Sequence, residues 1–381
     1  MRIKALPLLL IIVVAAVIPA TSAAETYRYR YVMSYVFENR GSTPFTLDQD
    51  DASVPLFVNN WHQTVTVMSS DPVLGDIYVD DDGNSLRKCG IPLTINPGQK
   101  LSYAVTYEIS SSDDPGISIN MNDAGGVSEI PSSLVTQYVF PTETFMSNST
   151  EVMNKAQLLT ENRTTVLGQV MAMLFWLKMN VTYDNIDVPR YPNETLKGLK
   201  GDCDDQAILL ISMCRSLGIP AYLQVGIVLS DGIDVSEKSW DDHLIIEEKG
   251  IGWHGWAMVY IPPWGWLPVD LTLTSTSNPL EVIQNSPERS HMVVTCLDIS
   301  KQAYIGDSRV TREKITASGL YVTSKDEAMV IEEETWADYT MIALGVVLAA
   351  SVIVMFWAAR RRSPGRREQV LSQPRTDTLS D

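Results

Sequence analysis

The chain has 381 residues, of which 46 are acidic and 29 basic, and its formal net charge is -17. This acidic balance argues against nucleic-acid binding and against electrostatic attachment to anionic lipid. Its four cysteines are too few for a disulfide scaffold, and they form neither a CxxC pair nor a His/Cys cluster at zinc spacing. We therefore expect no metal and no other cofactor.

The first 24 residues have the order of a secretory signal peptide. Arg2 and Lys4 precede an apolar run from Ala5 to Ala20, and the small residues TSAA follow it. This is the order of n-region, h-region and cleavage site, so we expect removal after Ala24. The alternative is an uncleaved anchor, because the run is about as long as a short spanning helix.

Residues 25–141 are predicted to form strands throughout. Segments such as TYRYRYVMSYVFEN and LSYAVTYEIS carry β-branched and aromatic residues in near alternation, and turn signals such as NRGSTP and NPGQ separate them. Regular short strands indicate an antiparallel β-sandwich. The acidic loop VDDDGNS is predicted to be a hairpin turn rather than a calcium loop, since Ser85 and Ile91 occupy the places of the EF-hand glycine and final glutamate.

Four N-glycosylation triplets come next, at Asn148, Asn162, Asn180 and Asn193. They predict a glycoprotein if the cell glycosylates its surface proteins.

The stretch GDCDDQAILLISMCRSLGIPAYLQVG places one cysteine at the start of a predicted helix. Two aspartates suited to a first helical turn follow Cys203, apolar residues then recur at helical spacing, Gly218 is the stop, and a strand follows at 221–229. A helix N-terminus stabilises a thiolate, the reactive form of cysteine. The alternative is a small core residue, because Asp204 and Asp205 would themselves raise the pKa of a neighbouring thiol.

A second block, WHGWAMVYIPPWGWLPVDLT, supplies candidate partners for this thiol. We expect His254 to open an alternating strand and Trp266 to Asp270 to form the antiparallel return strand after a Pro-Pro-Trp-Gly loop. The start of one hairpin strand lies beside the end of the other, so His254 and Asp270 are predicted neighbours. They are the base and the orienting residue that a thiol nucleophile needs. Structural roles are the alternative for each residue taken alone.

On the motifs GDCDDQA, RSLGIPA, HGW and GWLPVD, the chain resembles the transglutaminase-like superfamily, cysteine enzymes with a papain-like core. The resemblance covers roughly residues 160–275. It implies that Cys203 is the nucleophile, that His254 is the general base and then acid, and that Asp270 orients the imidazole.

The same resemblance extends to the segment before the nucleophile. It implies that Val166 to Met179 is the packing helix of the core, and that NVTYDN and ETLKGLKGDC lead to the catalytic cysteine. It does not identify the oxyanion donor. The backbone N–H of Cys203 and the side chain of Tyr183 are candidates.

From Leu273 to Glu334 the signals are weaker. TSTSNP and QNSPERS are predicted to be surface loops, HMVVTCLDI a strand, and the acidic VIEEET a short stalk. These pieces either complete the core or form a small additional module. Cys89 and Cys296 are a possible bridge between domains if Cys203 is reactive and Cys214 is buried.

Met341 to Ala359 is an apolar stretch followed by Arg360, Arg361 and Arg362, with tryptophans and a tyrosine near its ends. It predicts a transmembrane helix, and the positive-inside rule places the arginine-rich tail in the cytoplasm. A buried core helix is the alternative.

Together these signals predict an α+β protein in which a papain-like transglutaminase core follows an antiparallel β-sandwich and precedes a C-terminal transmembrane helix. The expected order is signal peptide 1–24, β-sandwich 25–141, catalytic domain 142–275, extension and stalk 276–338, transmembrane helix 339–359 and cytoplasmic tail 360–381.

The predicted function is that of a membrane-anchored extracellular cysteine enzyme that acts on amide bonds through a thioester, by hydrolysis or acyl transfer. Its expected partners are a protein or peptide substrate at the cell surface and the lipid bilayer, through Met341 to Ala359, without nucleic acid. The alternatives are a non-catalytic binding module and a structural envelope component built on the same fold.

Overall fold

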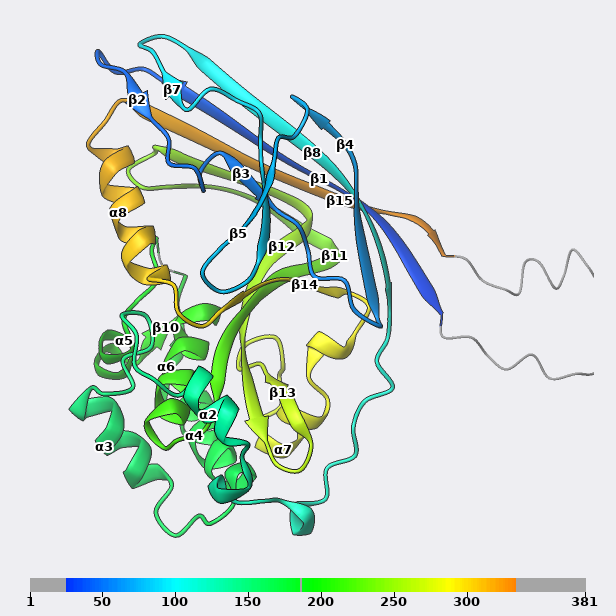
Figure 1. Ribbon diagram of the computed structural model, residues 1–381, viewed down its shortest axis with the longest axis vertical. Coiled ribbons are helices and arrows are strands. Elements are labelled where there is room, and N and C mark those ends of the chain that lie inside the picture. Colours follow the sequence, from blue (N-terminus) through cyan, green and yellow to red (C-terminus); the bar gives the residue numbers. More distant parts are fainter. Residues whose placement is uncertain (1–24, 186, 334–381) are drawn as a thin grey trace, which may run out of the picture. The chain divides into compact units, whose positions relative to one another are not determined.

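The computed structural model describes residues 25–185 and 187–333 (Figure 1). The expected signal peptide, the expected span at Met341 to Ala359 and the tail lie outside these residues. Within the described part of the chain, no helix combines the length and the apolar content needed to cross a membrane.

The strands are β1 (Thr26–Asn39), β2 (Phe45–Thr46), β3 (Ser53–Pro55), β4 (Gln63–Asp71), β5 (Ile77–Val79), β6 (Ser85–Lys88), β7 (Thr94–Ile95), β8 (Lys100–Ser112), β9 (Thr182–Tyr183), β10 (Lys200–Gly201), β11 (Ala221–Ser239), β12 (Leu244–Ile261), β13 (Gly265–Val269), β14 (Val293–Ile299) and β15 (Leu320–Glu333). The α-helices are α2 (Ser132–Tyr138), α3 (Thr150–Leu159), α4 (Val166–Asn180), α5 (Pro192–Gly198), α6 (Cys203–Ser216), α7 (Pro279–Gln284) and α8 (Tyr304–Thr316). Short 3-10 turns lie at Met121–Asp123, Val127–Glu129 and Pro287–Arg289.

One eight-stranded sheet contains the long strands, in the order β14-β11-β12-β15-β1-β8-β4, with β13 also paired to β12. Its neighbours are antiparallel except for β12 and β15, which run parallel. β1 pairs with β8 on one edge and with β15 on the other, from Tyr27 opposite Glu333 to Asn39 opposite Leu320. Strands from the two ends of the described chain therefore hold the sheet together.

The expected β-sandwich at 25–141 is not a separate pair of sheets. Its strands β1, β4 and β8 belong to the same sheet as β11 and β12, and two small sheets, β2-β7 and β3-β6-β5, accompany them. Residues 113–141 hold α2 and two 3-10 turns instead of strands. Alternation predicts that a segment is a strand, but it carries no information on which strands become neighbours.

The extension after residue 275 completes the sheet. HMVVTCLDI contains β14, as predicted, and the acidic end expected to be a stalk belongs to β15 as far as Glu333. The acidic end is a strand because it pairs with β1, as far as Tyr27 opposite Glu333. QNSPERS is likewise not a plain surface loop, because Ser286 and Glu288 are buried.

Two clusters of buried side chains form the core. The larger one lies between helices α3, α4 and α6 and strands β11 to β13, at the helical end of the sheet (Figure 1). The predicted packing helix is α4, within one residue of the expected bounds. The second cluster joins β1 and β8 to the small sheets, α8 and β15. Cys89 and Cys296 both lie in this second cluster as free thiols, not as the bridge considered above.

The loop VDDDGNS is the predicted hairpin turn, between β5 and β6. Val79 pairs with Ser85, and the Asp80 carboxylate accepts hydrogen bonds from the backbone N–H groups of Asp82 and Asn84.

Candidate active site

Helix α6 begins at Cys203, as predicted, and is almost entirely buried. Asp202 is its N-cap and accepts a hydrogen bond from the backbone N–H of Asp205, at 3.4 Å. Cys203 itself is partly exposed at the first position of the helix. The nucleophile candidate thus stands where the free N–H groups of a helix are concentrated.

The end of α6 explains the RSLGIPA motif in structural terms. Gly218 has a φ of 80°, and the N–H groups of Gly218 and Ile219 bond to the carbonyls of Arg215 and Cys214, which is a Schellman ending. The buried Arg215 guanidinium donates to the carbonyls of Ala221, Phe140 and Ser300, at 2.8, 3.2 and 3.1 Å. This arginine therefore fixes the helix to its surroundings and has no place in the chemistry.

Two glycines let α6 approach its neighbours closely. A Cβ at Gly201 would lie 2.7 Å from the Cβ of Asp205, and a Cβ at Gly255 would lie 3.2 Å from the Cβ of Asp204. Packing thus explains both glycines: Gly201 leaves room for Asp205, and Gly255 lets β12 approach the start of α6.

His254 and Asp270 are neighbours, as predicted from the hairpin. His254 Nε2 lies 2.9 Å from Asp270 Oδ2, and both side chains are buried, with exposed fractions of 7% and 1%. His254 does not open its strand, however, because β12 begins at Leu244 and the histidine lies in its second half. The charged residues Glu247 to Lys249 interrupt the apolar pattern of β12, so sequence analysis missed the first half of the strand.

The second oxygen of Asp270 is also fixed. Oδ1 accepts from the N–H groups of Thr272 and Leu273, at 2.7 and 3.1 Å. Burial by itself would raise the pKa of Asp270, but the hydrogen bond and charge of His254, with further hydrogen bonds, lower this pKa to about 2. Asp270 is therefore ionised at neutral pH and accepts the Nε2 proton of His254.

The Cys203 thiol lies at a gap in the sheet, near Gly255, which follows His254 in the sequence. One edge of β12 pairs with β15 as far as Lys249 and with β13 from Ala257 onward, so in the described residues no strand pairs with that edge between them. The backbone N–H groups of Gly255 and Asp204 reach the Cys203 thiol in the open stretch. The gap thus exposes backbone donors next to the candidate base.

The electrostatic surroundings of the thiol oppose its ionisation. Burial is the main cause, and the charge of Asp204 adds to it, so the pKa of Cys203 is raised, while the N–H groups of Gly255 and Asp204 only partly offset this. The expected lowering by the helix N-terminus does not prevail. Cys203 is therefore a thiol at rest, and an enzyme built on it must remove the proton during attack.

An acidic cluster surrounds the start of α6. Burial, together with the hydrogen bond and charge of Asp204, raises the pKa of Asp202 to about 10, so Asp202 is protonated at neutral pH. The hydroxyl of Tyr304 donates to Asp204 Oδ2 at 2.8 Å, and the backbone N–H of Arg190 donates to Asp205 Oδ1 at 2.6 Å. Sequence analysis missed Tyr304, which comes from α8, about a hundred positions from its partner.

Glu288 is the second residue that sequence analysis missed. Burial, and then the charge of Asp270, raise its pKa well above the usual range, so it holds a proton that it shares with Asp270. Ser286 donates a short hydrogen bond to its other oxygen. No local signal marks this role, because Glu288 lies in a polar, proline-containing segment.

Two groups have the spacing of possible metal ligands: His254, Asp270 and Glu288, and the three aspartates at the start of α6. In the first group, the Asp270 carboxylate accepts hydrogen bonds from His254 and from the protonated Glu288. In the second group, Tyr304 and backbone N–H groups are the donors. Asp205 Oδ2, in the second group, is buried and has no hydrogen-bond partner among the described residues.

Tyr183, the side chain considered for the oxyanion site, lies opposite Gly201 in the β9-β10 pair and is exposed. Burial of its hydroxyl and the nearby Cys203 and aspartates raise its pKa to about 12. Its hydroxyl is thus a protonated donor close to the thiol.

Comparison with known families places this site within one domain. Residues 153–271 match the model described as Transglutaminase-like superfamily, and this range includes Cys203, His254 and Asp270. These residues form a transglutaminase-like domain of mixed α+β structure. Glu288 and Tyr304 lie beyond the match. A search of curated proteins returned no match.

Several solved structures are similar at low identity. A candidate cysteine protease from Cytophaga hutchinsonii is 15% identical, with 82% of this chain and 93% of that chain covered and a TM-score of 0.47. The periplasmic domain of TgpA from Pseudomonas aeruginosa is 15% identical, with 71% and 94% covered and a TM-score of 0.32. The transglutaminase of red sea bream is 12% identical, with 74% and 51% covered and a TM-score of 0.26.

Proposed function

We propose that this protein is a cysteine enzyme that cleaves or transfers acyl groups of protein or peptide amides through a thioester on Cys203. The observation that carries the proposal is the buried His254–Asp270 hydrogen bond of 2.9 Å, on the strand whose open edge receives the Cys203 thiol. A histidine held by a carboxylate supports the assignment of His254 as the base for this thiol.

The tautomer of His254 follows from Asp270. Because the ionised carboxylate accepts the Nε2 proton, Nδ1 keeps its lone pair and is the base. As the sulfur attacks the amide carbon, Nδ1 takes the thiol proton, the S–C bond forms and the carbonyl π pair moves to oxygen. The C–N bond then breaks, and His254 returns the proton to the leaving amine. Water or an amine resolves the thioester.

The raised pKa of Cys203 favours this concerted removal of the proton over a preformed ion pair. The backbone N–H of Gly255 and the Tyr183 hydroxyl are the nearby donors suited to the developing oxyanion. The raised pKa of the Cys203 thiol also favours a competing function. In that case the protein is a binding or envelope protein that keeps the fold without catalysis.

Alkylation separates these two functions without a known substrate. Iodoacetamide should label Cys203 ahead of the buried Cys214, and His254→Ala should slow the labelling of Cys203 at least about tenfold by removing the base. Asp270→Asn should have a smaller effect, since it leaves the imidazole in place. Cys89→Ser, which removes a buried thiol of the second core cluster, is the control and should change nothing. Equal rates for Cys203 in the wild type and in His254→Ala would favour the binding protein.

We further propose that the catalytic part faces the outside of the cell, at the membrane. Its support is in the sequence: the signal-like start and the arginine-flanked apolar run at Met341 to Ala359. Protease added to intact cells should digest the catalytic part and spare an epitope after Arg362. Protection of the catalytic part would contradict this orientation.

A further inference from the structure

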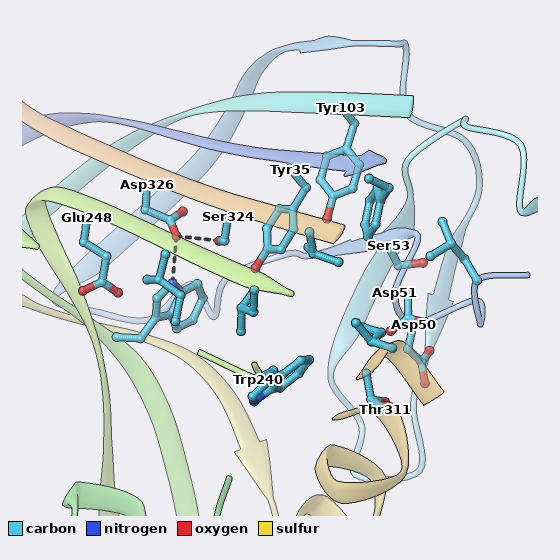
Figure 2. A pocket seen from close by; sticks show the side chains of 17 residues that line it. Tyr35, Asp50, Asp51, Ser53, Tyr103, Trp240, Glu248, Thr311, Ser324 and Asp326 are labelled. Carbon is cyan, nitrogen blue, oxygen red and sulfur yellow. Dashed lines mark hydrogen bonds between the residues drawn. The ribbon is translucent and has the colours of Figure 1, made fainter. Parts of the chain in front are cut away.

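A cavity of about 410 Å³ lies on one face of the sheet, between strands β1, β12 and β15 and helix α8 (Figure 2). This volume is within the range of small-ligand sites. The 17 residues that line it include five aromatic and four acidic side chains, and none of them is lysine, arginine or histidine.

The floor of the cavity is set by strand register. Glu248 lies beside Asp326, Ile246 beside Ser324 and Leu244 beside Val322 on the parallel pair β12-β15. Tyr35 and Phe37 of β1 continue the second and third of these rows. The floor is thus acidic at one end and apolar and aromatic along the rest.

The opposite end of the cavity is acidic as well. In Figure 2, Asp50 and Asp51 lie at one side of the view, Glu248 and Asp326 at the other, and Tyr35, Tyr103 and Trp240 between them. Val322 and Asp326, which both line the cavity, are four positions apart along β15, a length of about 13 Å. The cavity is therefore too long for a small cation to touch both of its ends.

Among residues 25–185 and 187–333, no cationic group pairs with the acids at the inner end. Asp326 is 1% exposed, and its oxygens accept from Tyr31, Trp253 and Ser324, all neutral donors. Burial raises the pKa of Asp326, and it raises that of Glu248 to about 6. At the outer end, the nearby Lys314 is bound by Asp48. A buried carboxylate without a cation is costly, and a bound cation would relieve that cost.

We propose that this cavity binds a linear aliphatic polyamine, with one ammonium group between Glu248 and Asp326, another at Asp50 and Asp51, and the carbon chain along the aromatic floor. Aromatic faces attract ammonium groups and cover methylene chains. This proposal does not depend on the function of Cys203.

The test is calorimetric titration of the purified full-length protein carrying Cys203→Ala, so that no reaction accompanies binding. Spermidine should bind at one site, at least tenfold more tightly than 1,3-diaminopropane, which is too short to span both ends. The neutral 1,8-octanediol should not bind detectably. Titrations at about 0.15 M salt suppress general attraction of polycations to an acidic protein.

Variants assign the binding to the cavity. Glu248→Gln and Trp240→Ala should each weaken spermidine binding at least tenfold. Trp240 lies in the turn between β11 and β12, outside the paired residues. Glu161→Gln removes one exposed charge far along the chain and is the matched control, expected within twofold of the parent. The proposal is overturned by absent binding, by equal affinity for the two amines, or by equal effects of Glu161→Gln and the cavity variants.

Discussion

Replacing Asp202 with asparagine should stabilise the protein, increasingly so as the pH rises. Asp202 has an ordinary pKa of 3.8 when the chain is unfolded and about 10 in the folded protein. Between these values the folded state holds a proton that the unfolded state has lost, so wild-type stability falls as pH rises. Asparagine does not titrate, and it caps helices as well as aspartate does.

The magnitude follows from the linkage. A pH of 7 is 3.2 units above the unfolded-state pKa of 3.8. At about 1.4 kcal/mol per unit, the loss of wild-type stability at this pH is at most about 4 kcal/mol. Because Asp202 is partly exposed and solvent screens its charge, we expect about half of this, roughly 2 kcal/mol.

Urea unfolding at pH 5 and pH 8 measures the effect. The stability gap between Asp202→Asn and wild type should widen by at least about 1.5 kcal/mol from the lower pH to the higher one. Glu161→Gln, an exposed acid outside the cluster, should show no such widening. A gap of equal size at both pH values would refute the protonated state of Asp202.

Variants at two further positions, Gly255 and Glu288, test the site itself. Gly255→Ala should slow iodoacetamide labelling of Cys203 by about tenfold, because the new methyl group would lie 3.2 Å from the Asp204 Cβ and push α6 away from β12; an unchanged rate would mean that this approach is not needed. Glu288→Leu should slow the same labelling by about tenfold, because it removes the proton donor to Asp270, whereas Glu288→Gln keeps a donor and should stay within twofold. Equal rates in the two Glu288 variants would show that Glu288 fills space and does not position Asp270.

The parts of the site that sequence analysis predicted are those with local signals. The start of α6 is marked by aspartates of the first turn, its end by Gly218, and the His254–Asp270 contact by a hairpin whose loop is only a few residues long. Each of these signals lies within about twenty residues of the feature that it predicts. Short-range chemistry was sufficient for all three candidate residues.

The missed parts depend on contacts between distant segments. β15 pairs with β1 across nearly the whole length of the described chain, and Tyr304 reaches Asp204 from a different helix. Glu288 is buried against Asp270 although its neighbours in sequence are polar. A pattern of alternation or polarity describes one segment, whereas these roles are decided by what packs against it.

The extension after residue 275 gives the candidate site a character that the matched domain alone does not have. It supplies Glu288, which forms a hydrogen bond with Asp270, and Tyr304, whose hydroxyl donates to Asp204 beside Cys203. β15 covers the edge of β12 only as far as Lys249, so the same segment also sets where the open edge begins. The candidate site therefore contains residues of the matched range, 153–271, and residues of the segment that follows it.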